Sequence, residues 1–429
     1  MTTFNALQNN VFHSMTDAQV RDIAGKHGTP VLVYSEDCLK RSADEALAFP
    51  NAFGLTVRYA MKAIPTAAVL QLFNRKGIHI DASSGYEVER AIIAGIAPEQ
   101  IQLTSQELPE NFAELVEKGV SFNACSLSQL EAFAQRFPGA ECSVRLNPGI
   151  GSGHNNRTNV GGPASSFGIW FEYLPKVLEI AATNNVKITG IHTHIGSGSD
   201  PEVWVKAAHL ALDLVRQIDT VHTLSLGGGY KVARIEGEKT ADLQNIGGRV
   251  KELFVEFNEK HNRQIHLEVE PGSYLVTNAG TILSRIMDVI DTGDKGFNFI
   301  KINSGMTDIL RVSLYGAQHP LKVVTREEKP ASKTNYVVVG HCCESGDIIT
   351  SQPGDPEGIK EVELETAAIN DYLLIGGAGA YCASMASKNY NSFPESPEVM
   401  LMSNGDVKVI KQKQTLQQVL TNEVTNLFD

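Results

Sequence analysis

The run Val57-Arg58-Tyr59-Ala60-Met61-Lys62-Ala63 places a lysine at the end of an apolar, strand-like segment. Burying an ammonium group alone is costly, so a lysine in this position must be solvated, paired or used covalently. Strand-like runs with polar or reactive residues at their ends recur from here to Gly272. This repeating pattern is the strongest indication of the fold in the chain.

Short β-type runs alternate with longer helical runs from about residue 57 to residue 272, which predicts an α/β domain with a parallel sheet. Eight repeats predict a closed (β/α)8 barrel of the TIM type, with an open doubly wound sheet as the alternative. The predicted strands are 57–62, 79–84, 101–105, 121–126, 143–148, 188–196, 223–229 and 265–272. The predicted helices are 66–76, 85–94, 108–118, 127–137, 173–184, 201–218 and 246–261.

After about residue 280 the runs become shorter, often alternate, and are separated by Gly, Pro, Asn and Asp. This pattern predicts an antiparallel C-terminal β domain, with a hairpin turn at residues 403–406. The opening strand Pro30–Tyr34 is expected to join that domain. We therefore predict an N-terminal segment over 1–35, a barrel over 36–280 and a β domain over 281–429.

The overall composition excludes several classes of protein. A length of 429 residues is too great for one ordinary core and predicts two domains. The net charge of -12 disfavours nucleic-acid and anionic-membrane partners, which require concentrated positive charge. The sequence contains no run of membrane-spanning length and no apolar signal segment at its start, and its six cysteines lack framework spacing. We expect reduced thiols and a cytoplasmic location.

Polar residues at the ends of the predicted strands carry the functional signal. In a barrel these ends form one face, where active sites are built, and the last two loops commonly bind phosphate. Those loops contain Gly227-Gly228-Gly229 and Pro271-Gly272. A lysine, a glycine loop for a phosphate and a carboxylate for a pyridinium nitrogen are the parts that hold pyridoxal phosphate. The strand-end residues are Lys62, Asp81, Ser84, Arg145, Asn147, His194, Gly227, Gly228, Gly229 and Glu270.

Each feature also has an ordinary structural explanation, such as a surface lysine, a tight turn or an ion pair. The functional interpretation rests on their joint order along the chain. His192 and His194 are spaced for a metal pair on a strand, but no third ligand accompanies them, so we predict no metal site. A metal-dependent barrel hydrolase using these histidines with Asp81 and Glu270 remains an alternative that metal analysis would decide.

Several motifs in family order, spanning about residues 30 to 400, resemble the fold-type III pyridoxal-phosphate decarboxylases. The chain is most similar to the diaminopimelate decarboxylase family, as a divergent member, which implies an alanine racemase/ornithine decarboxylase-like fold. The carriers are Tyr59-Ala60-Met61-Lys62-Ala63, Asp81-Ala82-Ser83-Ser84-Gly85, His194-Ile195-Gly196-Ser197-Gly198, Gly227-Gly228-Gly229, Glu270-Pro271-Gly272, Leu314-Tyr315-Gly316-Ala317, Cys343-Glu344-Ser345-Gly346-Asp347, Gly379-Ala380-Tyr381 and Tyr390-Asn391-Ser392.

The resemblance implies a role for each matching residue of the cofactor site. Lys62 would bind the cofactor's aldehyde covalently, His194 would stack on its ring, and Glu270 would pair with the pyridinium nitrogen. The resemblance also places Asp81 and Arg145 among the residues that bind the cofactor. The phosphate would be held by Ser197, Gly227, Gly228, Gly229, Gly272 and Tyr381.

The resemblance also implies a homodimer with shared active sites, because Cys343 and Glu344 would reach into the partner's site. Arg311 and Tyr315, with Tyr381 and position 273, match residues at the substrate's distal end. The chemistry agrees, since Glu270 keeps the pyridine protonated and so favours decarboxylation, whereas a racemase of this fold has an arginine there. Cys343 is then the candidate acid that returns a proton to Cα.

The chain departs from the family at the distal end of the substrate site. Ser273 and the segment Phe393-Pro394-Glu395 stand where arginines are usual, and Arg157, in the unusual loop 149–166, is a candidate substitute. We expect decarboxylation of meso-diaminopimelate to L-lysine. The alternatives are another substrate (a siderophore or antibiotic-pathway conjugate, lysine or ornithine), an amino-acid racemase, and a non-catalytic cofactor carrier, against which the β domain argues.

Overall fold

The computed structural model describes residues 11–151, 160–327, 330, 332–424 and 427, which fall into two compact units. The barrel unit comprises Lys40–Val232 and Lys239–Leu275. The β unit comprises the chain up to Leu39, the short segment Ala233–Glu238, and the chain from Val276 onward. None of the helices in these described residues is long and apolar enough to cross a membrane.

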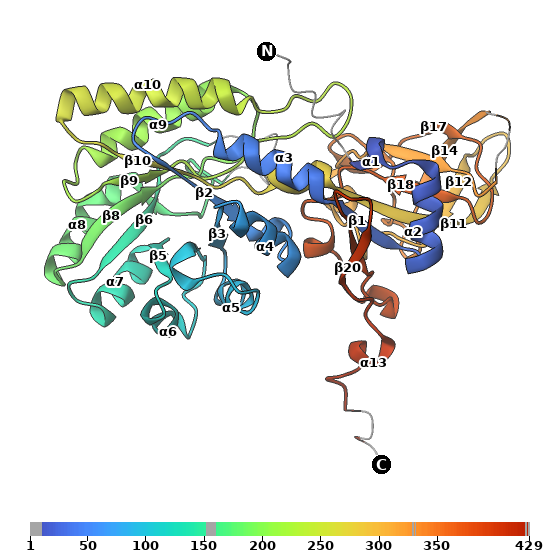
Figure 1. Cartoon of the computed structure of the whole chain (residues 1–429), viewed down its shortest axis with the longest axis horizontal. Coiled ribbons are helices and arrows are strands. Elements are labelled where there is room, and N and C mark those ends of the chain that lie inside the picture. Colours follow the sequence, from blue (N-terminus) through green and yellow to red (C-terminus); the bar gives the residue numbers. More distant parts are fainter. Residues whose placement is uncertain (1–10, 152–159, 328–329, 331, 425–426, 428–429) are drawn as a thin grey trace. The chain divides into compact units, whose positions relative to one another are not determined.

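In the barrel unit, eight parallel strands of the described chain close into a ring, as predicted (Figure 1). The pairing of β5 with β6 closes the barrel, and a short strand β7 (Ile169–Trp170), which was not predicted, pairs with Leu146 and Asn147 at the end of β6. The ring strands are β2 (Leu55–Ala60), β3 (His79–Ala82), β4 (Ile101–Leu103), β5 (Ser121–Ala124), β6 (Glu141–Asn147), β8 (Lys187–His192), β9 (Thr223–Ser225) and β10 (His266–Val269).

Helices follow the strands, and their starts are fixed by local capping. The Ser84 side chain accepts a hydrogen bond from Glu87 N, and the Ser126 side chain accepts one from Gln129 N. Their apolar faces are buried, as Val69, Leu70 and Phe73 illustrate. The helices are α4 (Ala67–Arg75), α5 (Gly85–Ile93), α6 (Phe112–Glu117), α7 (Leu127–Arg136), α8 (Leu174–Thr183), α9 (Pro201–Val215) and α10 (Leu243–His261).

Buried polar side chains on the ring strands contact one another across neighbouring strands. Arg58 on β2 donates to both carboxylate oxygens of Glu268 on β10, at 3.1 and 2.9 Å. The Asn123 amide donates to Thr104 Oγ1 at 3.2 Å. Buried charges of this kind are tolerated only when they are paired and hydrogen-bonded. These two contacts pair buried polar groups inside the barrel unit.

The β unit contains a sheet in the order β17-β14-β12-β11-β1-β19-β20, with β18 pairing both β11 and β13. The prediction that the opening strand joins this domain is confirmed, because β1 pairs β11 and β19. The strands are β1 (Val31–Ser35), β11 (Gly280–Asp291), β12 (Asn298–Ile302), β13 (Leu321–Val324), β14 (Lys333–Val339), β17 (Val362–Glu365), β18 (Tyr372–Ile375), β19 (Glu398–Leu401) and β20 (Val407–Lys411).

The predicted antiparallel β domain is confirmed in that most pairings of this sheet are antiparallel, but the sheet also contains parallel pairings. β1 runs parallel to β19, and β12 runs parallel to β14. Parallel neighbours need a long connection, and the segment between β12 and β14 supplies one that includes α12 (Arg311–Tyr315) and β13. The predicted hairpin is confirmed: β19 and β20 are antiparallel, and Met402 N donates to Asp406 O at 2.8 Å.

Candidate active site

Lys62 lies directly after β2, in the single turn Met61–Ala63, and its side chain is exposed. The positive charge of Lys62 acts to lower the pKa of two carboxylates, Asp81 on β3 and Glu87 on α5. Burial and the nearby Glu270 raise the pKa of Asp81 to about 7, while Lys62 opposes that shift. Asp81 Oδ1 is buried without a hydrogen-bond partner among the described residues. One oxygen of this carboxylate therefore lacks a donor, while Thr104 is a hydrogen-bond partner of the group.

Glu270 follows β10 and is held by side chains from three other strands. Its Oε1 accepts from Ser225 Oγ at 2.8 Å and from the Gln102 amide at 3.5 Å. Its Oε2 lies 2.9 Å from His192 Nε2. Burial alone would raise the pKa of Glu270, but His192 and the Ser225 hydrogen bond outweigh burial and lower it to about 2. Glu270 is therefore a fixed, buried carboxylate at neutral pH.

His194 and Arg145 lie at the ends of the neighbouring strands β8 and β6. Burial, Arg145 and Lys62 together hold the pKa of His194 well below its usual value, so its ring is neutral. His194 Nδ1 is buried and has no hydrogen-bond partner in the described part of the chain. The Arg145 guanidinium is itself buried and lies 5.0 Å from the centre of the Phe167 ring. A flat, uncharged imidazole is suited to stacking on an aromatic ligand.

Gly227, Gly228 and Gly229 form a turn that admits no other residue. Gly227 and Gly229 have φ angles of +67° and +90°. A Cβ on Gly228 would stand 2.2 Å from Glu270 O, and one on Gly229 would stand 1.7 Å from Gly196 O. The backbone N–H groups of Gly228 and Gly229 donate to no backbone carbonyl of the described chain. The loop thus offers free donors, as anion-binding glycine loops do.

The predicted cofactor residues of the barrel unit fit pyridoxal phosphate. The glycine loop and the loop after β8 are joined, since Gly198 N donates to Gly229 O at 3.0 Å, which places exposed Ser197 beside the free N–H groups. Gly272 follows Glu270 after one intervening residue, Pro271. Lys62, Asp81, Glu270, His194, Arg145 and the glycine loop are brought together at one end of the strands, with the unpartnered Asp81 and His194 atoms among them.

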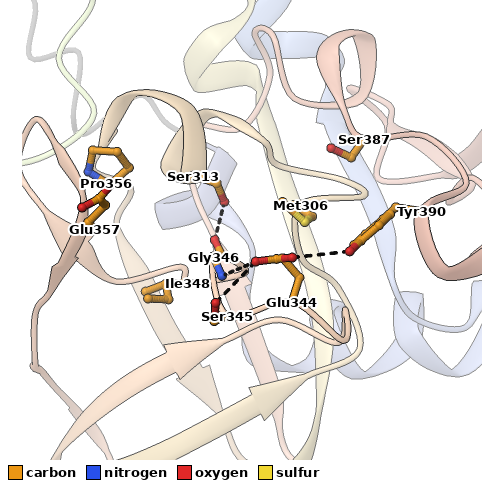
Figure 2. Close-up of a pocket in the computed structure, with 10 residues that line it drawn as sticks. All are labelled: Met306, Ser313, Glu344, Ser345, Gly346, Ile348, Pro356, Glu357, Ser387 and Tyr390. Atoms are coloured by element: carbon orange, nitrogen blue, oxygen red, sulfur yellow. Dashed lines mark hydrogen bonds between the residues drawn. The ribbon is translucent and has the colours of Figure 1, made fainter.

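The β unit contains a pocket of about 570 Å3, and one of the predicted site residues, Glu344, is among the residues that line it (Figure 2). Glu344 lies in its wall, where its Oε1 accepts from Gly346 N at 3.1 Å and its Oε2 accepts from Tyr390 OH at 3.5 Å. Ser313 closes another side by donating to Gly346 O at 2.8 Å. A carboxylate held by neutral donors in an open pocket can receive a cationic group.

The loop that carries Cys343 and Glu344 is anchored by Asp347. The Asp347 carboxylate accepts from Met306 N at 2.7 Å and from Cys342 N at 2.9 Å. Gly305 and Gly340 leave room for it, because a Cβ on either would stand about 2 Å from its oxygens, at 2.2 and 2.1 Å. The anchor leaves Cys343 exposed at the tip of the loop.

Asn391 fixes the backbone of Cys343 from a second direction. Cys343 N donates to Asn391 Oδ1 at 2.7 Å, and Asn391 has a φ of +49°. Tyr381 also has a positive φ, +56°, although it has a bulky side chain. Non-glycine residues in this conformation are uncommon and gather at functional sites.

The structure describes most, but not all, of the residues predicted to bind the distal end of the substrate. Arg311 and Tyr315 are the first and last residues of α12, and Arg311 Cζ lies 5.9 Å from the Tyr315 ring centre. Arg311 Nε is buried without a partner among the described residues. Ser273 begins the short helix α11 (Ser273–Val276). Arg157, the candidate substitute for the missing arginine, lies outside the described residues.

Some site residues were missed by sequence reasoning. His192, Ser225 and Gln102 hold Glu270. His192 and Ser225 lie two residues before His194 and Gly227, on the same face of their strands, and this spacing is a signal that could have identified them, whereas Gln102 has no such signal. Within the described residues, no group of three His, Cys, Asp or Glu side chains is arranged to hold a metal ion. His192 Nε2 lies 2.9 Å from Glu270 Oε2, so this carboxylate is its neighbour in the described structure.

Comparison with known proteins gives one consistent result. The family model for the pyridoxal-dependent decarboxylase, pyridoxal binding domain matches residues 39–277. Diaminopimelate decarboxylase of Escherichia coli K12 is 31% identical over 433 residues, covering 97% of this chain and all of the relative (100%). A diaminopimelate decarboxylase crystal structure matches with TM-score 0.89 and 30% identity, over 97% of this chain and 99% of that one. A mutant Helicobacter pylori diaminopimelate decarboxylase complexed with L-lysine matches with TM-score 0.81 and 25% identity, over 93% and 98%.

Proposed function

The chain belongs to the pyridoxal-dependent decarboxylases, and from this premise we propose that it converts meso-diaminopimelate to L-lysine and CO2. Its match to diaminopimelate decarboxylases extends over both units, since 97% of the chain is covered. Pyridoxal phosphate is the cofactor that this family implies. The reaction breaks the bond between one Cα and its carboxylate and puts a proton on that carbon.

The buried carboxylate of Glu270 is the observation that carries the proposal. When bound, pyridoxal phosphate supplies an electron sink for the pair left behind by CO2. A carboxylate with a pKa of about 2 stays ionised and can keep a proton on a pyridine nitrogen beside it. His192 and Ser225 fix that carboxylate in place before any ligand arrives. This arrangement favours decarboxylation over racemisation.

The other residues bind, orient and supply protons. The amine of Lys62 is exposed and would bind the aldehyde of the cofactor. The neutral imidazole of His194 would stack on the ring of the cofactor. The N–H groups of Gly228 and Gly229 are free for its phosphate. The exposed Cys343 thiol, at the tip of its anchored loop, is the proposed proton donor to Cα.

We propose that the distal amine of the substrate binds Glu344. The pocket around this carboxylate is lined by Tyr390, Ser313 and Met306, without a basic side chain (Figure 2). In the family the corresponding loop serves the site of a second subunit, so a homodimer with shared sites is part of the proposal. A cytoplasmic location agrees with the six free cysteines.

The test is a comparison of kcat/KM for meso-diaminopimelate, L-lysine and L-ornithine with the pyridoxal-phosphate-loaded protein. We expect meso-diaminopimelate to be preferred by at least about 100-fold, the discrimination that one desolvated charged contact gives. A preference for lysine or ornithine would contradict the proposal. It would mean that Ser273, in place of the usual arginine, marks a changed substrate.

A further inference from the structure

The glycine loop, residues 227–229, has no side chains with which to hold its own shape. Glycine has more conformational freedom than any other residue, so a run of three needs anchors outside the run. Glu270 N donates to Gly227 O at 2.8 Å, which anchors the first residue of the loop. The first side chain after the loop is that of Tyr230. Tyr230 is therefore the first residue that can anchor the loop from its C-terminal side.

The backbone at Tyr230 pairs with the loop that follows β8. Tyr230 and Gly198 form a parallel bridge outside the regular strands, in which Gly198 N donates to Gly229 O and Lys231 N donates to Gly198 O, each at 3.0 Å. Two hydrogen bonds are a weak link by themselves, because each replaces a hydrogen bond to water. The side chain of Tyr230 therefore has to add to this link if the loop is to be fixed.

The Tyr230 ring lies between two other aromatic rings of the barrel unit. It stacks on Trp204 of α9, with the ring centres 5.0 Å apart and the planes inclined by 13°. It also meets the ring of Phe49 edge-on, at 6.0 Å and 64°. None of the three side chains is more than 2% exposed. Aromatic pairs in these geometries are favourable beyond the area that they bury, so the three rings form an aromatic clamp beside the glycine loop.

The clamp joins the two loops that lie beside the free N–H groups. Trp204 is the fourth residue of α9, and that helix begins three residues after Gly198. The start of the helix is fixed by Asp200, whose side chain accepts from Glu202 N at 3.0 Å. Tyr230 follows the glycine loop directly. The stack of these two rings therefore sets the separation between the glycine loop and the loop after β8.

The surroundings of the clamp are shaped to the rings and not to their polar atoms. A Cβ on Gly247 of α10 would stand 3.0 Å from Phe49 Cδ1 and 2.4 Å from Pro50 Cδ, so the helix lies close against this ring. Tyr230 OH and Trp204 Nε1 are buried and have no hydrogen-bond partner in the described part of the chain. An unpaired buried polar atom lowers stability, so it is the rings that hold the clamp together.

We propose that Tyr230 and Trp204 are positioning residues for the phosphate group of the cofactor. Their stack keeps the N–H donors of the glycine loop and the loop after β8 at the separation that one phosphate spans, although neither ring has to touch it. An anion is bound tightly when its donors already converge before it arrives. The inference rests on pyridoxal phosphate as the cofactor of the proposed function. It predicts that the clamp controls affinity for the phosphate and not for the pyridine ring.

The test compares the binding of pyridoxal phosphate with that of pyridoxal, which has the same ring and aldehyde but no phosphate. Absorbance titrations of the cofactor-depleted full chain give both dissociation constants for wild type, Y230L, W204L, Y230F and F133L. Phe133 is the matched control, since it is 1% exposed and stacks on Phe122 at 5.1 Å and 3° in the same unit. Thermal unfolding of each variant shows how much stability the substitution removes.

We expect Y230L and W204L to weaken pyridoxal phosphate binding by about tenfold or more while pyridoxal binding changes less than about threefold. Y230F keeps all three rings and should stay within about threefold of wild type for both ligands. F133L should lose stability without changing the preference for the phosphorylated ligand. W204F keeps an aromatic face, should lie between wild type and W204L, and serves in place of the leucine variants if they do not fold.

Equal weakening of the two ligands in Y230L and W204L would overturn the inference, because it would indicate a general loosening of the site. An unchanged preference for pyridoxal phosphate would overturn it as well, and so would an F133L variant that loses as much of that preference as Y230L. Failure of the proposed function would appear separately, as a wild-type protein that binds pyridoxal phosphate but releases no CO2 from meso-diaminopimelate.

Discussion

At the scale of single residues, the site depends on carboxylates whose charge is fixed by their neighbours. Lys62, His194, Arg145 and Glu270 could be predicted from their positions at strand ends, since parallel strands present those ends on one face. The contact of Gln102 with Glu270 could not, because it depends on the register between strands that are distant in sequence.

Replacing Glu270 with glutamine should lower kcat for meso-diaminopimelate by about 100-fold or more, because a neutral amide cannot hold a proton on the pyridine nitrogen. The matched control is E45Q, which removes a half-buried carboxylate bonded to Tyr274 at 3.1 Å in the same unit. E45Q should stay within about threefold of wild type. Steady-state CO2 release measures both variants, and an E270Q enzyme as active as E45Q would refute the role given to Glu270.

Asp308 should make stability depend on pH in the acidic range. Burial raises its pKa in the folded protein to about 6, above the value of about 4 in an unfolded chain, despite the hydrogen bond from Ser396. The folded state therefore binds the proton more tightly, and the resulting stability is present below pH about 4 and lost as pH rises through about 6. D308N lacks this dependence.

The free energy of unfolding of wild type should consequently fall relative to that of D308N between pH 4 and 6, by up to about 3 kcal/mol. Urea unfolding at several pH values measures the difference. The exposed carboxylate of Asp406, in the turn between β19 and β20, provides the control, and D406N should follow wild type. Parallel pH curves for wild type and D308N would contradict the expected burial effect.

At the scale of elements, the eight ring strands and the helices between them were predictable, because each combines an apolar run with a local cap or turn signal. The helix α3 (Glu36–Leu47) and the short strand β7 were missed. β7 has only two residues, Ile169 and Trp170, and pairs with Leu146 and Asn147 at the end of β6, beyond the residues that pair with β8. The parallel pairings of β1 with β19 and of β12 with β14 join distant segments, which local patterns do not encode.

The glycine loop gives the sharpest prediction for an element. G229A should reduce affinity for pyridoxal phosphate by at least about 100-fold, since a Cβ there would stand 1.7 Å from Gly196 O and push apart the two loops that meet at the site. Gly77 has nearly the same φ, +88° against +90°, but open space around it. G77A therefore controls for backbone strain alone and should bind the cofactor normally in an absorbance titration. Equal losses in the two variants would show that strain, not the close approach, matters.

At the scale of the whole molecule, the predicted functional residues divide between the two units. The predicted cofactor residues other than Tyr381 lie on the barrel unit, while Tyr381, Cys343, Glu344 and Arg311 lie on the β unit. The proposal of shared sites in a homodimer can be tested by mixing two inactive variants, K62A and C343A. Random exchange of subunits should restore about a quarter of wild-type activity, because half of the dimers regain one intact site. No recovery, with exchange verified by mass spectrometry, would mean that each chain completes its own site.

The most direct test of the central claim is NMR analysis of the product formed from meso-diaminopimelate in D2O by the cofactor-loaded protein, with CO2 measured in parallel. The account predicts one L-lysine for each CO2, carrying a single deuterium on the carbon that lost its carboxylate, and no product from K62A. Deuterium entering unreacted meso-diaminopimelate without CO2 would identify a racemase and contradict the account. The absence of any product from a protein that has bound the cofactor would contradict it equally.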